Sequence, residues 1–204
     1  MKVKYALGIY VIVLLQLISQ TATGQVLQVT DLKIEHLDNP IGMDTPNPRF
    51  SWKVLSDQDG MNQRTFQLLV GTDSTQIAQG RGNVWSSGII ESDNVMTRYA
   101  GTPLLPCTRY YWAVNVADGN NRKVSSPVAC FETGKMGLDA WHGNWISDHY
   151  DRNHFPAPYF RKSFSVDNPI KKARIYVAVA GLYQLHLNGK RLGDTMLDPV
   201  YTRF

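Results

Sequence analysis

The stretch that decides the fold is residues 104–116, Leu-Leu-Pro-Cys-Thr-Arg-Tyr-Tyr-Trp-Ala-Val-Asn-Val. Its spacing is typical of a tyrosine corner, in which a tyrosine at the start of a strand hydrogen-bonds through its hydroxyl to upstream backbone. Side chains two residues apart along a strand share one face. Four residues of this strand are therefore predicted to build a core between two sheets: Tyr110, Trp112, Val114 and Val116.

Short apolar runs with a period of two continue on both sides of this stretch, from residue 26 to residue 133. The clearest are residues 50–54 (Phe-Ser-Trp-Lys-Val), 66–71 and 128–131. Residues 118–121, Asp-Gly-Asn-Asn, predict a hairpin turn. No window holds a sustained helical period with a cap and a stop, so the sequence predicts an all-β fold. Such spacing over about 100 residues indicates a seven-stranded sandwich.

A second block begins near Trp141. Residues 160–166 and 173–179 are predicted strands, and residues 183–187 alternate before Asn188-Gly189, a strong hairpin signal. The 64 residues from Trp141 to Phe204 are few for a jelly roll of eight strands. The second sandwich is therefore predicted to be incomplete.

The first 24 residues have the pattern of a signal peptide. Lys2 and Lys4 give a positive start, an apolar run of 14 residues follows, and Ala22 and Gly24 suit a signal-peptidase site before Gln25. The alternative is a membrane anchor, but 14 residues reach only about 21 Å, less than the ~30 Å bilayer core. We expect an exported protein, periplasmic or extracellular, with no membrane association after cleavage.

These patterns combine into one organisation. The fold class is all-β: a fibronectin-III/immunoglobulin-like β-sandwich, then an incomplete, jelly-roll-like second β-sandwich, with a signal peptide in front. The expected boundaries are 1–24 for the signal peptide, 25–135 for the first sandwich, 136–144 for a linker and 145–204 for the second sandwich.

Charge and cysteine content exclude several functions. The formal net charge of +4 includes Lys2 and Lys4, and no basic run exceeds Lys171-Lys172, so a nucleic-acid partner is not expected. Cys107 and Cys130 lie out of opposition in the expected hairpin. A disulfide would distort the backbone. Two free, mostly buried thiols are preferred, and the bridge stays an alternative. Two cysteines also fall short of a four-ligand zinc site.

No catalytic, cofactor-binding or metal-binding residue is predicted. Aspartates in turns usually bond to nearby backbone, and we assign that role to Asp57, Asp59, Asp73, Asp93, Asp118, Asp148, Asp151 and Asp167. The five histidines are His36, His142, His149, His154 and His186, and none shows a ligand spacing on a helix. His149 and His154 flank Asp151 in what we interpret as a solvated loop. Residues 80–83 lack the Lys-Ser/Thr of a phosphate loop.

Aromatic residues gather near the expected linker: Trp141, Trp145, Tyr150, Phe155 and Tyr159. An exposed ring can stack on a sugar. The preferred interpretation is burial of Trp145 and Ile146 under the linker, because large aromatics are mostly buried.

Two ordered sets of short motifs run through the chain. The first set lies in the first block: residues 39–42, 48–52, 84–88, 99–104, 111–114 and 131–134. The second set follows it: residues 141–146, 159–164, 173–177, 181–183, 187–189 and 197–202. With these motifs the chain resembles the N-terminal region of bacterial α-L-rhamnosidases. The first set is similar to the family's fibronectin-type-III-like domain, and the second to the junction and the start of the family's next β-sandwich.

The resemblance implies a role within a larger enzyme. Family members hydrolyse terminal α-L-rhamnosyl linkages with inversion, using acidic residues of an (α/α)₆ barrel that nothing in this chain matches. We expect an accessory region that packs on a downstream catalytic domain, meets the rhamnose-containing glycan only through the parent enzyme, and is inactive alone. The alternatives are a free-standing carbohydrate-binding module and a fibronectin-like protein-interaction module.

Overall fold

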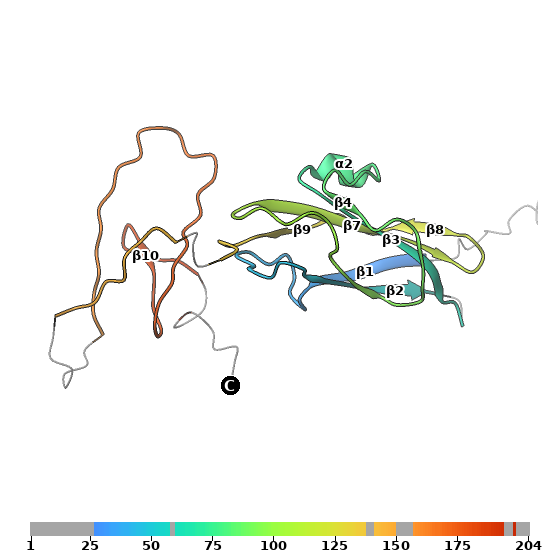
Figure 1. Cartoon of the computed structure of the whole chain (residues 1–204), viewed down its shortest axis with the longest axis horizontal. Coiled ribbons are helices and arrows are strands. Elements are labelled where there is room, and N and C mark those ends of the chain that lie inside the picture. Colours follow the sequence, from blue (N-terminus) through green and yellow to red (C-terminus); the bar gives the residue numbers. More distant parts are fainter. Residues whose placement is uncertain (1–26, 58–59, 138–140, 150–156, 194–197, 199–204) are drawn as a thin grey trace, which may run out of the picture. The chain divides into compact units, whose positions relative to one another are not determined.

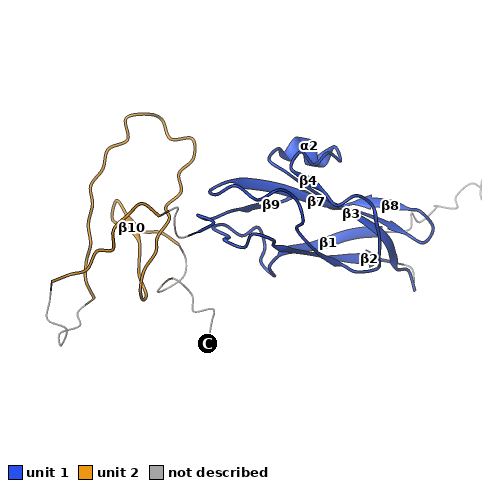
Figure 2. Cartoon of the chain, viewed as in Figure 1, with its two compact units in different colours: residues 1–140 blue, residues 141–204 orange. Residues whose placement is uncertain are grey.

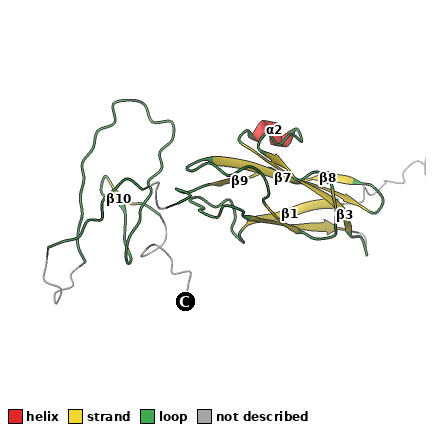
Figure 3. Ribbon diagram, in the orientation of Figure 1, coloured by secondary structure: helices red, strands yellow, loops and turns green. Residues whose placement is uncertain are grey.

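The structure is a computed structural model that describes residues 27–57, 60–137, 141–149, 157–193 and 198. The chain divides into two compact units, unit 1 (Met1–Ala140) and unit 2 (Trp141–Phe204), coloured separately in Figure 2. Regular structure is almost entirely strand (Figure 3), which confirms the all-β prediction. The predicted signal peptide lies outside the described residues.

Unit 1 is a sandwich of two antiparallel sheets (Figure 1). The first sheet has three strands in the order β1-β2-β6, with bounds β1 (Leu27–Ile34), β2 (Arg49–Ser56) and β6 (Met96–Arg98). On β2, Phe50 and Trp52 are buried while Lys53 is exposed. The predicted alternation of this strand is therefore confirmed.

The second sheet is built on two long central strands, β3 (Gln63–Gly71) and β7 (Arg109–Asp118). Two short strands pair with β3 and two pair with β7: β4 (Trp85–Ser86), β5 (Ile90–Glu91), β8 (Lys123–Ser125) and β9 (Ala129–Glu132). The prediction of seven strands is wrong for this unit, because the connection from β3 to β7 contributes three strands of two or three residues, β4, β5 and β6.

The tyrosine corner is present at the start of β7. The backbone N–H of Leu105 donates a hydrogen bond of 2.8 Å to the hydroxyl of Tyr110. All four predicted core residues of this strand are no more than 2% exposed: Tyr110, Trp112, Val114 and Val116. The corner and the core face predicted from residues 104–116 are thus confirmed.

Aromatic rings from both sheets form the core. Phe50 on the first sheet contacts Trp112 and Phe131 on the second, edge to face, with ring centroids 4.8 and 5.9 Å apart. Trp52 packs on Phe66 at 5.1 Å. Burying a side chain such as Phe stabilises the fold by about 1.5–3 kcal/mol. These cross-sheet contacts hold the two layers together.

A tight turn after β6 shows why the motif at residues 99–104 has its form. The hydroxyl of Tyr99, a buried residue, donates a hydrogen bond of 2.7 Å to the carbonyl of Thr102. Gly101 lies against this ring, and a Cβ at that position would come within 2.6 Å of the Tyr99 hydroxyl and 2.7 Å of Trp85. A larger residue would therefore force the turn apart.

A short helix, α2 (Ser74–Ala78), covers part of the outer face of the second sheet (Figure 1). The carboxylate of Asp73 caps it by accepting two backbone N–H bonds, at 2.7 and 3.2 Å. Ile77 packs there with Leu69 and Ala113. The sequence predicted no helix, because five residues are too few to show a helical period. No helix among the described residues is long and apolar enough to span a membrane.

The pairing of β7 with β9 places the two cysteines apart. Cys130 lies opposite Tyr111, whereas Cys107 precedes β7, and both thiols are free as preferred. The predicted burial is wrong, since Cys107 is exposed and Cys130 half-buried. Cys107 sits in the left-handed region with φ +51°, in the bend that leads into the corner, where little packs over its side chain.

Unit 2 contains one regular ladder among its described residues. Strand β10 (His186–Leu187) pairs with β11 (Lys190–Arg191) around Asn188 and Gly189, both with positive φ. The predicted Asn-Gly hairpin is confirmed.

The strands predicted at residues 160–166 and 173–179 are wrong. The structure assigns no strand to either segment, and their large apolar side chains are 37–67% exposed. A strand is held by its ladder with a neighbour. The described residues of unit 2 offer only β10, β11 and a bridge between Tyr183 and Asp198. Alternating apolar residues alone therefore did not produce strands here.

Candidate functional site

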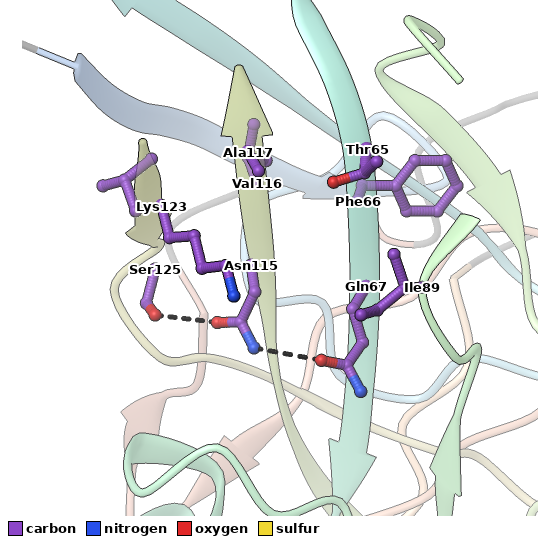
Figure 4. A pocket seen from close by; sticks show the side chains of 10 residues that line it. Thr65, Phe66, Gln67, Ile89, Asn115, Val116, Ala117, Lys123 and Ser125 are labelled. Atoms are coloured by element: carbon purple, nitrogen blue, oxygen red, sulfur yellow. Dashed lines mark hydrogen bonds between the residues drawn. The ribbon is translucent and has the colours of Figure 1, made fainter. Parts of the chain in front are cut away.

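The outer face of the second sheet carries a pocket of about 310 Å³ over β3, β7 and β8 (Figure 4), which we call the β3–β7–β8 pocket. Ten residues line it: Thr65, Phe66, Gln67, Ile89, Asn115, Val116, Ala117, Lys123, Val124 and Ser125. Its volume is at the lower end of the ~300–1,000 Å³ that is usual for small-molecule sites.

Strand register brings these residues together from β3 and from the β7–β8 hairpin, which are far apart in the sequence. Side chains on a strand alternate between faces, and two rows across the sheet point outward: Gln67–Asn115–Ser125 and Thr65–Ala117–Lys123. Of the lining residues between these rows, Phe66 and Val116 belong to the core, and the half-buried Val124 packs against it. The pocket thus lies on the polar outer face of the second sheet, opposite the face that is buried in the core.

The first row, Gln67–Asn115–Ser125, is a chain of hydrogen bonds that we call the amide row. The Ser125 hydroxyl donates to Oδ1 of Asn115 over 2.7 Å, and Nδ2 of Asn115 donates to Oε1 of Gln67 in a longer bond of 3.5 Å (Figure 4). Nε2 of Gln67 then donates to the Ser86 hydroxyl over 3.1 Å. Every bond runs in the same direction, which orients both amides.

The rest of the lining supplies one charge and one apolar rim. Lys123 is the single charged residue of the ten, and none of them carries a carboxylate. Ile89 is 73% exposed beside the row. Ala117, with the smallest side chain of the lining, lies between Thr65 and Lys123 and leaves the hollow open.

The aspartates assigned to turns behave as predicted where they have described partners. Asp73 caps α2, and the backbone N–H bonds that it accepts lower the pKa of its carboxyl. Asp118 accepts from the backbone N–H groups of Asn120 and Arg122 and from Nε of Arg122. The guanidinium of Arg122 lowers the pKa of Asp118. Asp59 and Asp151 lie outside the described residues.

Two ion pairs were not predicted. Glu132 is almost fully buried beside Arg109, whose Nε donates to it over 2.6 Å. Glu35 receives two bonds from the Arg49 guanidinium, at 2.7 and 3.1 Å, and the pKa of Glu35 is lowered mainly by them. Each pair joins neighbouring segments of unit 1, so these carboxylates have a structural role.

Histidines do not form a metal site in the described part of the chain. His36, His142, His149 and His186 are exposed, and no three His, Cys, Asp or Glu side chains of the described residues gather around one point. His154 and Asp151 lie outside these residues, so the prediction of a solvated loop is untested there.

The expected burial of Trp145 and Ile146 under the linker is wrong. Trp145 is 76% and Ile146 is 68% exposed, and Tyr159 is fully exposed. Residues 141–149 form no strand or helix, so no regular layer is available there to cover these side chains. Tyr150 and Phe155 lie outside the described residues.

The β3–β7–β8 pocket was missed at the sequence level. Gln67 and Asn115 are 48 residues apart, and only the pairing of β3 with β7 places them opposite each other. A usable signal existed in the alternation of β7, where Asn115 interrupts an outward series of Tyr111, Ala113 and Ala117.

The two-sheet sandwich with a tyrosine corner defines unit 1 as an immunoglobulin-like domain. Residues 29–137 match the family model described as "Rha78A-like, N-terminal immunoglobulin domain". The chain belongs to this family. Residues 168–204 match a second model, "Alpha-L-rhamnosidase N-terminal domain".

The similar proteins with known names are α-L-rhamnosidases, the enzyme class named in the second model. An α-L-rhamnosidase of Streptomyces avermitilis is 30% identical over 197 residues, covering 84% of this chain and 19% of that protein. One from Formosa agariphila is 28% identical over 190 residues, covering 81% and 20%. The structure of α-L-rhamnosidase from Dictyoglumus thermophilum matches with TM-score 0.77 and 36% identity over 86% of this chain and 22% of that one. The chain spans about a fifth of the curated relatives it matches, in their N-terminal portion.

Proposed function

We propose that this chain acts as the accessory N-terminal region of an exported α-L-rhamnosidase, an enzyme that removes terminal α-L-rhamnosyl groups. The observation that carries the proposal is the order of the two family matches, an immunoglobulin-like domain at 29–137 and a rhamnosidase N-terminal domain from 168. Similarity to relatives of that name across both regions supports it.

The role is structural support for a catalytic part elsewhere in the parent protein. Unit 1 has a closed core, whereas unit 2 exposes two apolar series, Phe160, Phe164 and Val166 in one and Ile175, Val177 and Val179 in the other. Exposed apolar stretches of this kind mark surfaces that bind other protein. We infer that unit 2 completes its packing against further segments of the parent enzyme.

Catalysis is not expected from this chain alone. Inverting hydrolysis needs two carboxyl groups about 6.5–9.5 Å apart across the sugar. The carboxylates of Asp73, Asp118, Glu35 and Glu132 are each engaged in a cap, a turn or an ion pair. Their bonds fix them to the scaffold of unit 1 and leave them poorly suited to acid–base work.

A chimaera tests the proposal. In the Streptomyces avermitilis relative, this chain replaces the matched N-terminal portion, and hydrolysis of an aryl α-L-rhamnoside is measured. We expect the chimaera to cleave the substrate, a version lacking this portion to be insoluble or weakly active, and the chain alone to be silent. Turnover by the chain alone, abolished by replacing one of its own carboxylates, would overturn the proposal, as would an inactive but folded chimaera.

Export is proposed from the charged start and apolar run of residues 1–24. N-terminal analysis of protein secreted by a bacterial host should give a chain that starts at Gln25. Retention of Met1 in a membrane fraction would contradict export, without bearing on the role proposed for the rest of the chain.

A second candidate function is a carbohydrate-binding module, and the exposure of Trp145 and Tyr159 favours it. Rings on a surface can stack on a sugar face. In that case Trp145→Ala should abolish retention of the chain on an immobilised rhamnose-containing glycan. Retention that Trp145→Ala leaves unchanged, or no retention of the unsubstituted chain, would contradict this second function and leave the accessory role as the sole proposal.

A further inference from the structure

The outer face of the second sheet changes character along β3 and β7. At Leu69 and Ala113, which lie opposite each other, α2 covers the face and Ile77 fills the contact. Two residues further along, Gln67 and Asn115 form the next outward pair and are polar. The helix thus covers the apolar part of the face and leaves the polar part to solvent.

The amide row presents hydrogen-bond donors in fixed orientations. Oδ1 of Asn115 and Oε1 of Gln67 each accept from the preceding member of the row. Each side-chain NH₂ has two hydrogens and uses one of them, that of Asn115 on Gln67 and that of Gln67 on the Ser86 hydroxyl. Two oriented N–H groups therefore remain for a ligand, and they need no reorganisation when it binds.

The pocket floor and rim provide a surface for C–H groups. Ala117 gives a shallow floor, and the exposed side chain of Ile89 stands beside Gln67 (Figure 4). A ligand with hydroxyls on one side and C–H groups on the other matches this combination. Sugar rings have that composition, and a single ring suits a pocket of about 310 Å³.

The charge of the pocket selects among sugars. The lining has no carboxylate, and Lys123 adds an ammonium group at the end of the second row. An ammonium group attracts a carboxylate and offers three donors to it. A single lysine without arginine is a weak match for a phosphate dianion, which favours bidentate guanidinium groups.

We propose that the β3–β7–β8 pocket binds one acidic sugar residue of a glycan, a hexuronate. Its hydroxyl oxygens accept from the amides of Gln67 and Asn115, its carboxylate pairs with Lys123, and its C–H groups lie against Ile89 and Ala117. The site uses none of the exposed rings of unit 2.

Titration by NMR tests the site with two probes that differ only in the carboxylate, methyl glucuronide and methyl glucoside. With the isotope-labelled full chain, we expect shifts of the side-chain NH₂ signals of Gln67 and Asn115 at millimolar to tens of millimolar sugar. An exposed ion pair predicts that the glucuronide binds about two- to fivefold more tightly. Added salt should reduce this preference.

Three variants make the test specific. Lys123→Met should remove the preference for the glucuronide while glucoside binding persists, and Asn115→Ala should abolish both. Lys190→Met, an exposed lysine on β11, should change neither and serves as the matched control. No shift with either probe, shifts that centre on Trp145 and Tyr159, or equal affinities that Lys123→Met leaves unchanged would each overturn the proposal. The chimaera experiment is independent of all these results.

Discussion

Unit 1 and unit 2 carry the same kind of sequence signal with different results. In unit 1, alternating apolar residues at Phe50 and Trp52 are buried against a second sheet. In unit 2, the series that contains Phe160 and Phe164 is exposed and forms no strand. The difference teaches that alternation specifies which face can be buried, whereas a partner layer decides whether burial happens.

The largest expected difference between the two units is their rate of cleavage in limited proteolysis. Because unit 1 has a closed core and the described part of unit 2 has little regular structure, we expect cleavage within residues 141–193 to be roughly a hundredfold faster than within 27–137. Mass spectrometry of the digest should show a surviving fragment close to residues 27–137. Equal resistance through residue 193 would mean that unit 2 is as well packed as unit 1.

A matched pair of phenylalanines brings the comparison down to single side chains. Phe50 is fully buried and Phe164 is 67% exposed. We expect Phe50→Ala to lower the free energy of unfolding by about 3–5 kcal/mol, and Phe164→Ala to change it by less than about 0.5 kcal/mol. Denaturant unfolding monitored by tryptophan fluorescence measures both. A large effect at Phe164 would show that this series is packed in solution.

A pair of tyrosines isolates the hydrogen bond of the corner. Tyr110→Phe removes the acceptor of the Leu105 N–H and should cost about 1–3 kcal/mol of unfolding free energy, since the donor loses its partner. Tyr159 is fully exposed, and Tyr159→Phe should have no measurable effect. Identical denaturant midpoints for the two variants would show that the corner contributes nothing to stability.

The smallest expected effect is the pH dependence of the β7–β8 turn. The bond from Arg122 lowers the pKa of Asp118 in the folded chain, so its stabilisation is complete above the ordinary aspartate pKa and disappears as the pH falls through the lowered value. Asp118→Asn should lower the denaturant midpoint at neutral pH and flatten its decline below about pH 4. Parallel midpoint curves for the variant and the parent chain would contradict this role.

Residues 104–116 were enough to predict the corner and the core face of β7, and the short apolar runs between residues 26 and 133 predicted the sandwich, because each depends on local spacing. The same reasoning missed α2, whose five residues show no period and whose cap, Asp73, has the sequence appearance of any turn aspartate. It predicted strands in unit 2 that lack neighbours in the described part of the chain. Local pattern therefore predicted those elements whose structure depends on residues close together in the sequence, and it failed where a partner strand was needed.

The β3–β7–β8 pocket could not be predicted from local sequence spacing. Gln67, Asn115 and Ser125 become a row only through the pairing of β3, β7 and β8, and each alone is an ordinary polar residue on a solvent face. The Arg109–Glu132 pair depends likewise on the register of β7 and β9. Long-range register is the information that a single sequence does not display.

The path of the chain through unit 1 has a mechanical consequence. β1 begins at Leu27 opposite Ser56, close to the loop that leads into Gln63 and its partner Asp118, whereas β9 ends at Glu132 opposite Arg109, at the other end of β7. The ten residues of β7 separate these ends by about 30 Å. Tension between Leu27 and Glu132 would run along the strands, so the ladder bonds of β1 and β9 would be loaded in shear, many at once, and unit 1 would behave as a stiff tether under load.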